Sequence, residues 1–198
     1  MNEKLVHLAS QYDRYKKSIA ELEGETQHSS IHTRTFLDIR YVLDYALAGI
    51  RAEESDDQLS AKKHYDDASR HLDRYALDAF DLIAAKSLNE AREQIESASV
   101  FSRRGIAKAY YEESMSHFSA GKELFEDSVS AFNEGRTSRT EDIEQSLTRF
   151  RQAAYTARQV RFSVDSAPTT EKFMLWWAII IGLLTLINAI YLIINILT

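Results

Sequence analysis

The chain has 198 residues, a formal charge of −6, one proline, six glycines and no cysteine. The acidic balance argues against nucleic-acid binding, which needs a basic surface, and the lack of cysteine leaves no thiolate chemistry or disulfide framework. Few helix breakers and abundant alanine, leucine and charged residues favour an all-α fold, because no segment alternates convincingly with the period of a strand.

A first helix is predicted over residues 3–23. Its apolar residues recur at alternating spacings of three and four, which is typical of the seam of a coiled coil. The row comprises Leu5, Leu8, Tyr12, Tyr15, Ile19 and Leu22. Gly24 is expected to end this helix, because glycine is a poor helix former.

A second helix is predicted over 30–53, and it has two candidate buried rows. The more apolar row is Phe36, Ile39, Leu43, Ala46 and Ile50. The weaker row is Ile31, Thr35, Asp38, Val42 and Tyr45. We expect the more apolar row to be buried, with Leu37, Tyr41 and Leu47 broadening it.

A third helix is predicted to start at a capping box, Ser55 to Gln58, and to run to about Lys86. Ser87 to Glu90 repeats the same signature, which either starts a new helix or lies inside a continuous one. We favour a kink or short turn there and a fourth helix to about Phe101. The break expected after that helix is SRRG at 102–105.

Two more helices complete the part of the chain before residue 166. The fifth, over 104–133, has a heptad row interrupted only by Lys122, which comprises Ala107, Tyr111, Met115, Phe118, Phe125, Val129 and Phe132. A capping box at Ser138 to Glu141 starts the sixth, which ends near Asp165. Pro168 then marks a hinge over 166–172, because proline cannot continue a helical ladder.

These elements predict an elongated, antiparallel bundle of about six helices over 1–165, since each apolar stripe must be covered by another helix. The alternative is a helical-repeat array. It is the weaker interpretation, because no constant period near that of helical hairpin repeats emerges.

Residues 173–197 form a run of 25 residues without a charge. About 20 apolar residues suffice to cross a bilayer as a helix, so the run predicts a transmembrane anchor. Lys172, Trp176 and Trp177 suit the headgroup layer at its start. Basic residues near one end of a span keep that end on the cytoplasmic side, so the bundle is expected in the cytoplasm. The basic residues that precede the span include Arg149, Arg151, Arg158 and Arg161.

Polar side chains recur along one face of this anchor. They are Thr185, Asn188, Tyr191 and Asn195. Amide side chains in lipid commonly bond to a neighbouring helix, so this face predicts self-association of the anchor. The alternative is that Asn195 and Tyr191 lie among the far headgroups and contact water.

The sequence has little that indicates catalysis. His28 and His32 have a spacing that two ligands of one metal could share on a helix, but the surrounding pattern matches no metalloenzyme motif. No glycine-rich phosphate loop, serine elbow or cysteine nucleophile occurs. We therefore expect no enzyme, no metal and no cofactor.

The function expected from this layout is a tail-anchored, single-pass membrane protein whose cytoplasmic bundle is an interaction or scaffold module. Its expected partners are the lipid bilayer, a protein of unknown identity and, where the anchor self-associates, further copies of itself. The alternative is a membrane-active effector or sensor that oligomerises through the polar face of the anchor. Two questions stay open: whether the tyrosines form a core or a groove for a partner helix, and whether the sixth helix packs in the bundle or on the membrane.

Overall fold

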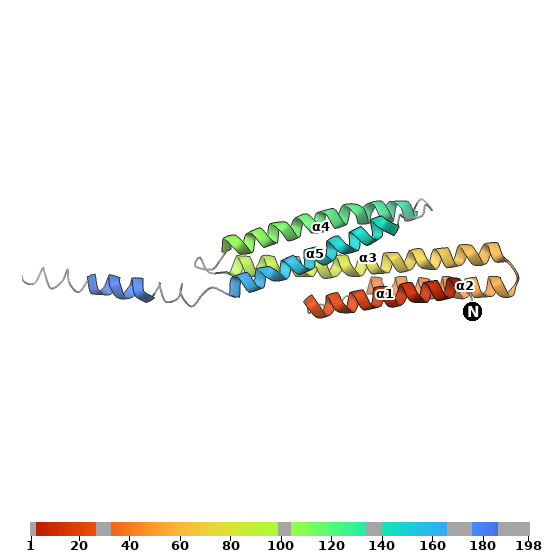
Figure 1. Cartoon of the computed structure of the whole chain (residues 1–198), viewed down its shortest axis with the longest axis horizontal. Helices are drawn as coiled ribbons and strands as arrows, with labels where there is room; N and C mark the ends of the chain where they lie inside the picture. The colour runs from red at the N-terminus through yellow and green to blue at the C-terminus, as the bar shows by residue number, and fades with distance from the viewer. Residues whose placement is uncertain (1–2, 27–32, 99–103, 134–139, 166–175, 186–198) are drawn as a thin grey trace, which may run out of the picture.

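The computed structural model describes residues 3–26, 33–98, 104–133, 140–165 and 176–185. Five long helices lie within these ranges, and a shorter helical stretch covers 176–185 (Figure 1). The long helices are α1 (Glu3–Thr26), α2 (Thr33–Glu54), α3 (Gln58–Ser97), α4 (Arg104–Asn133) and α5 (Thr140–Asp165). No strand occurs in the described residues, so the predicted all-α class is confirmed.

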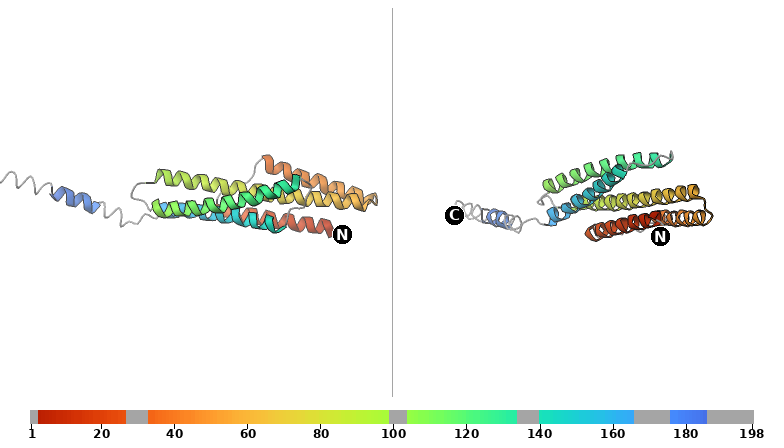
Figure 2. Two further views of the ribbon diagram at one scale, coloured as in Figure 1. Left: turned by 90° about the horizontal axis from the view of Figure 1, so that it is seen from above. Right: turned by 45° about the vertical axis from the view of Figure 1, so that its right-hand side comes forward.

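Helix α3 is the centre of the bundle and packs against each of the other four long helices. Helices α1, α3 and α5 run in one direction while α2 and α4 run in the other, so consecutive helices are antiparallel (Figures 1 and 2). Helices α1 and α2 flank the first half of α3, and α4 lies along its second half. The predicted elongated bundle is therefore confirmed, and the chain is not a row of stacked helical hairpins.

Helix α3 has 40 residues and continues through the site of the predicted kink. The Ser87 hydroxyl is buried and donates a 2.9 Å hydrogen bond to the carbonyl of Ile83, one turn earlier. A serine that bonds back to this carbonyl sits inside a helix rather than capping a new one. The prediction of a separate fourth helix at Ser87 was therefore wrong, and that segment is the end of α3.

The connection between α2 and α3 also differs from the prediction. The amides of Asp56 and Asp57 bond to the carbonyls of Glu53 and Ala52, at 2.9 Å each, and Asp56 has a φ of 58°. This is the pattern of a Schellman helix end, in which aspartate can replace the usual glycine. Ser55 therefore belongs to the end of α2, and the N-cap of α3 is Asp57, whose carboxylate accepts from the Ser60 amide at 3.0 Å.

The buried seam of α4 consists of small residues, of which only Ala107 belongs to the predicted row, while Phe118 and Phe125 of that row pack against the core in part. The small residues recur every seven positions and are Ala107, Ser114, Gly121 and Ser128. They allow a close approach to α5, where the Ser114 hydroxyl donates to the Ala153 carbonyl at 2.5 Å. The Ser146 hydroxyl likewise donates to the Gly121 carbonyl at 2.9 Å. Met115, from the predicted row, is 38% exposed.

Lys122 interrupts the apolar pattern of α4 because it makes an ion pair with α3. Its Nζ lies 2.8 Å from Oδ2 of Asp81 and over the rings of Phe118 and Phe125. The half-buried lysine thus ties α4 to α3 at the middle of the bundle.

None of the helices within the described ranges is long and apolar enough to traverse a bilayer. The predicted span, 173–197, is described only over 176–185. These ten residues are helical and exposed.

Candidate interaction surfaces

The row of α2 that was predicted to be buried is partly open, and the weaker row faces α3. Asp38 and Val42 are each 7% exposed, whereas Leu43 is 59% exposed. The prediction was wrong for Leu43, although Ile39 and Ala46 of the same row pack against the core in part, because it compared only the hydrophobicity of the two rows. The side chains of α3 that meet α2 include His64 and His71, whose rings lie against Tyr45 of the weaker row.

Four large side chains on α2 are left between 44% and 59% exposed. They are Leu37, Tyr41, Leu43 and Leu47, which we call the α2 face. Leu43 and Leu47 are one turn apart on one side, and Leu37 and Tyr41 are one turn apart on the other. The ion pair of Arg40 and Asp44, at 3.8 Å, lies between them. Exposed apolar side chains gathered around a few polar groups are typical of a protein-binding surface.

His71 lies where α2 meets α3, stacked against Tyr41 and Tyr45 with ring centroids 5.2 Å apart in each case. Burial and the neighbouring Arg74 and Arg70 lower the pKa of His71 from its usual 6.5. The Asp38 carboxylate, whose Oδ1 lies 4.0 Å from Nδ1 of His71, does not reverse the lowering of the His71 pKa. His71 is therefore neutral near pH 7, which suits its stacked position.

A buried polar network holds α1 to α3. The Tyr15 hydroxyl and the Gln11 amide each donate to Oδ1 of Asp73 at 2.6 Å, and the Ser69 hydroxyl donates to Oε1 of Gln11 at 2.8 Å. Burial raises the pKa of Asp73, and the bonds from Tyr15 and Gln11 lower it partway back. Burial also raises the pKa of Tyr15. The network therefore aligns α1 on α3.

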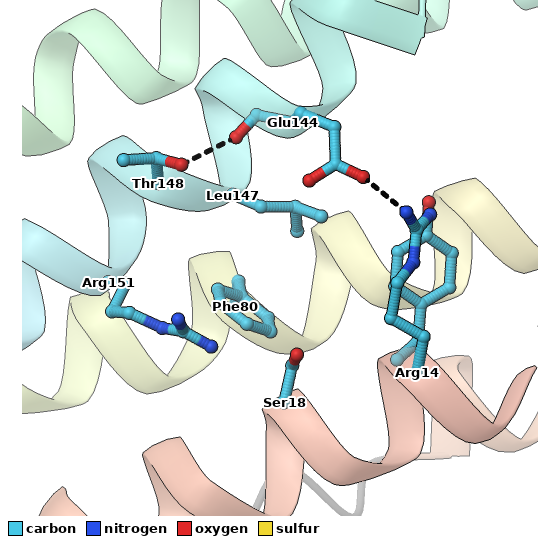
Figure 3. A pocket seen from close by; sticks show the side chains of 8 residues that line it. Arg14, Ser18, Phe80, Glu144, Leu147, Thr148 and Arg151 are labelled. Carbon is cyan, nitrogen blue, oxygen red and sulfur yellow. Dashed lines mark hydrogen bonds and ion pairs between the residues drawn. The ribbon is translucent and has the colours of Figure 1, made fainter. Parts of the chain in front are cut away.

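A pocket of about 80 Å³ lies beside this network, between α1, α3 and α5 (Figure 3). Its walls carry the hydroxyls of Ser18 and Thr148 and the guanidinium groups of Arg14 and Arg151. Arg14 is paired with Glu144 at 2.8 Å. Arg151 lies 5.7 Å from the ring centroid of Phe80, which is the apolar wall.

The four predicted juxtamembrane arginines do not share one face of α5. Arg149 points to α4, where its Nη1 lies 3.3 Å from Nδ1 of His117. Arg151 and Arg158 lie on the opposite side together with Tyr155 and Phe162, both of which are more than half exposed. Arg161 is exposed between these two sides. Helix α5 itself packs in the bundle, because Phe150 and Val160 are fully buried.

The residues predicted at the membrane are described only in part. Trp176 and Trp177 lie in the helical stretch over 176–185 and are 65% and 50% exposed. The Thr185 hydroxyl donates to the Ile181 carbonyl at 2.7 Å. Lys172, Asn188, Tyr191 and Asn195 lie outside the described residues, as do Pro168, His28 and His32. The polar face of the anchor therefore stays a prediction.

Within the described part of the chain, no group of three or more histidine, aspartate or glutamate side chains is arranged to hold a metal ion. His64 and His71 are both engaged with tyrosine rings of α2.

The spacing of residues along α5 predicts a stripe of arginines and aromatic residues that was not recognised from the sequence. Arg151, Tyr155, Arg158 and Phe162 follow intervals of four, three and four, so they form one stripe along the helix. The prediction grouped these arginines by their nearness to the expected membrane span rather than by helical face.

Comparison of the chain with protein-family models, curated proteins and solved structures gave no match.

Proposed function

We propose that this protein is a single-pass, membrane-anchored interaction module. The segment 173–197 holds it in the bilayer, and the α2 face binds a helix of a protein partner on the cytoplasmic side. The observation that carries the proposal is that four large apolar side chains gather on one face of α2, whereas in their described residues α3, α4 and α5 each expose at most two.

The shape of the α2 face supports a helical partner. Two apolar ridges, each made of two residues one turn apart, flank one acidic and one basic side chain. A helix laid between such ridges buries its own apolar side chains, as amphipathic helices do in grooves of other proteins. The Arg40 and Asp44 pair favours a partner that carries both charge signs along its seam.

The anchor is supported by the 25 uncharged residues of 173–197. Its described part, 176–185, exposes apolar side chains that include Ile179, Ile181 and Leu184. Exposed apolar surface of this extent is unfavourable in water and favourable in lipid. The basic residues before it support the cytoplasmic orientation of the bundle.

Site-specific photocrosslinking in native membranes tests the partner surface. A photoreactive amino acid at Leu43 or Leu47 is expected to give discrete adducts with one partner, whereas the same group at Leu59 should give none. Leu59 is a fitting control because it is a leucine on α3 that is 82% exposed. With the photoreactive group at Leu37, the variant L43Q/L47Q should lose the adduct while its free energy of unfolding changes by less than about 0.5 kcal/mol. Equal crosslinking from all positions, or none from the α2 face, contradicts the proposal.

Flotation of the full-length protein with lipid vesicles tests the anchor. The wild type is expected to float and to resist extraction at high pH. The variant I181R/L184R should be extracted, because each arginine near the middle of a span costs about 3 kcal/mol. Leakage of ions from the same vesicles would instead support the alternative, an effector that oligomerises through its anchor. An interaction module leaves the vesicles sealed.

A further inference from the structure

Helix α5 carries an exposed stripe of alternating arginines and aromatic residues. Arg151, Tyr155, Arg158 and Phe162 lie on one face at helical spacings of four, three and four, with Tyr155 56% and Phe162 53% exposed. We propose that this stripe docks on an anionic phospholipid surface, so that the bundle lies against the membrane that holds the anchor. This inference rests on the proposed membrane anchoring.

The two arginines of the stripe have guanidinium groups that are available to an anion. Each is held against an aromatic ring, Arg151 over Phe80 at 5.7 Å and Arg158 over Phe162 at 5.8 Å. Among the described residues, neither guanidinium makes an ion pair with a carboxylate. A guanidinium that lies over an aromatic ring and has no carboxylate partner can still donate its N–H groups to a phosphate.

The pocket at the beginning of the stripe has the size and the chemistry to take one phosphate group (Figure 3). Its volume of about 80 Å³ equals the space of two to three water molecules. The ion pair with Arg14 neutralises Glu144, the acidic residue of the lining, so the charge of Arg151 is left uncompensated. The hydroxyl of Ser18 lines the same space and adds a donor for a phosphate oxygen, whereas the Thr148 hydroxyl donates to the Glu144 carbonyl at 2.8 Å.

The composition of the stripe favours a lipid surface over an acidic protein segment. Tyrosine and phenylalanine rings prefer the layer between headgroups and acyl chains, and arginines prefer the phosphates just above it. A stripe that contains both kinds of residue matches this layered surface, whereas an acidic peptide would give Phe162 no apolar environment.

The length of the connection makes this docking possible. Helix α5 ends at Asp165 and the apolar run begins at Phe173, so seven residues, 166–172, separate them. Seven residues span at most about 25 Å. Once the anchor is inserted, the stripe is held close to the bilayer, and binding to the lipid becomes an intramolecular step with a high effective concentration.

A single fluorescent label in the full-length protein tests the proposal, because the chain contains no cysteine. In Y155C, an environment-sensitive dye on the new thiol reports whether the stripe meets lipid. The protein is reconstituted into vesicles of phosphatidylcholine alone or mixed with phosphatidylserine. We expect a blue shift and quenching by lipid-borne quenchers in the mixed vesicles only. The dye in S116C, at an exposed position on α4, should stay in water in both.

Charge-matched variants separate the stripe from general electrostatic attraction. In the Y155C background, R151Q/R158Q should lower the ratio of docked to undocked bundle by about thirtyfold, because each basic residue near an anionic leaflet contributes about 1 kcal/mol. The control R92Q/K108Q removes the same charge from exposed positions on α3 and α4 and should leave the ratio within about twofold.

Each remaining outcome overturns a specific step. A protein that floats with the vesicles while the dye at position 155 stays in water overturns the docking but leaves the anchor intact. A protein that does not float overturns the proposed function itself. Equal docking on neutral lipid contradicts the role of the arginines. A dye response to polyglutamate, with none to phosphatidylserine, would show that the stripe binds acidic protein segments instead.

Discussion

The hydroxyl of Tyr15 on α1 donates a 2.6 Å hydrogen bond to Oδ1 of Asp73 on α3, and Tyr15 is only 2% exposed. This bond joins two helices that are far apart in the sequence, and it compensates a carboxylate whose pKa is raised by burial. Because α1 does not pack along α2, its position depends largely on α3 and on this network.

Replacing Tyr15 by phenylalanine is expected to lower the free energy of unfolding by about 1.5–3 kcal/mol, the usual range for a hydrogen bond to a charged group. The loss arises because Asp73 stays buried with one donor fewer. Urea denaturation measures it. The matched control, Y12F, concerns a tyrosine of the same helix that is 37% exposed, and it should change stability by less than about 0.5 kcal/mol. Equal losses in both variants would contradict the role of Asp73.

His71 should make the stability of the bundle depend on pH. Folding lowers its pKa from 6.5, so in the window just below 6.5 the unfolded chain binds a proton that the folded chain does not. Stability therefore decreases as the pH falls through this window. Unfolding measured from about pH 8 to about pH 5, where histidine titrates, should show a shallower slope in H71N than in the wild type. The matched control variant is H7N, which changes an exposed histidine of α1.

Gly49 is needed where α2 crosses α3. A Cβ at this position would lie 2.8 Å from Cε1 of Tyr65, a buried ring that cannot move away easily. G49A is expected to destabilise the protein by about 1–3 kcal/mol, the usual cost of overpacking a core. Gly24 in α1 has no atom within 4 Å of such a Cβ, so G24A should instead stabilise the helix by up to about 1 kcal/mol. Thermal unfolding of the two variants should thus shift in opposite directions.

The ion pair of Lys122 and Asp81 should contribute more to the free energy of unfolding than an exposed ion pair. K122M leaves the half-buried carboxylate of Asp81 without its cation, and we expect a loss of about 1–3 kcal/mol. K108M breaks the exposed pair of Lys108 and Glu112 at 3.6 Å and should cost less than about 1 kcal/mol. Adding D81N to K122M should recover part of the loss in chemical denaturation. No recovery would show that the lysine acts through its contacts with Phe118 and Phe125 alone.

Much of the candidate site could not be predicted from the sequence, for one physical reason. A helical period shows which residues share a face but not which neighbour that face meets. For α2 the more apolar row was expected inside, yet Asp38 and Val42 face α3, where His71 stacks on Tyr45. In α4 the buried seam is the heptad row of small residues, which hydrophobicity ranks low and which is buried because α5 approaches closely.

The sequence by itself determined the helical class, the bounds of α4 and α5 and the approximate extents of α1 and α2, because these depend on local propensity and on apolar periodicity. Only the tertiary structure decided that α3 is one helix through Ser87 and that the α2 face stays open, because both depend on contacts between residues distant in the chain. A hydroxyl that bonds within its own helix and one that caps a new helix have the same local sequence, and only the surrounding packing distinguishes them.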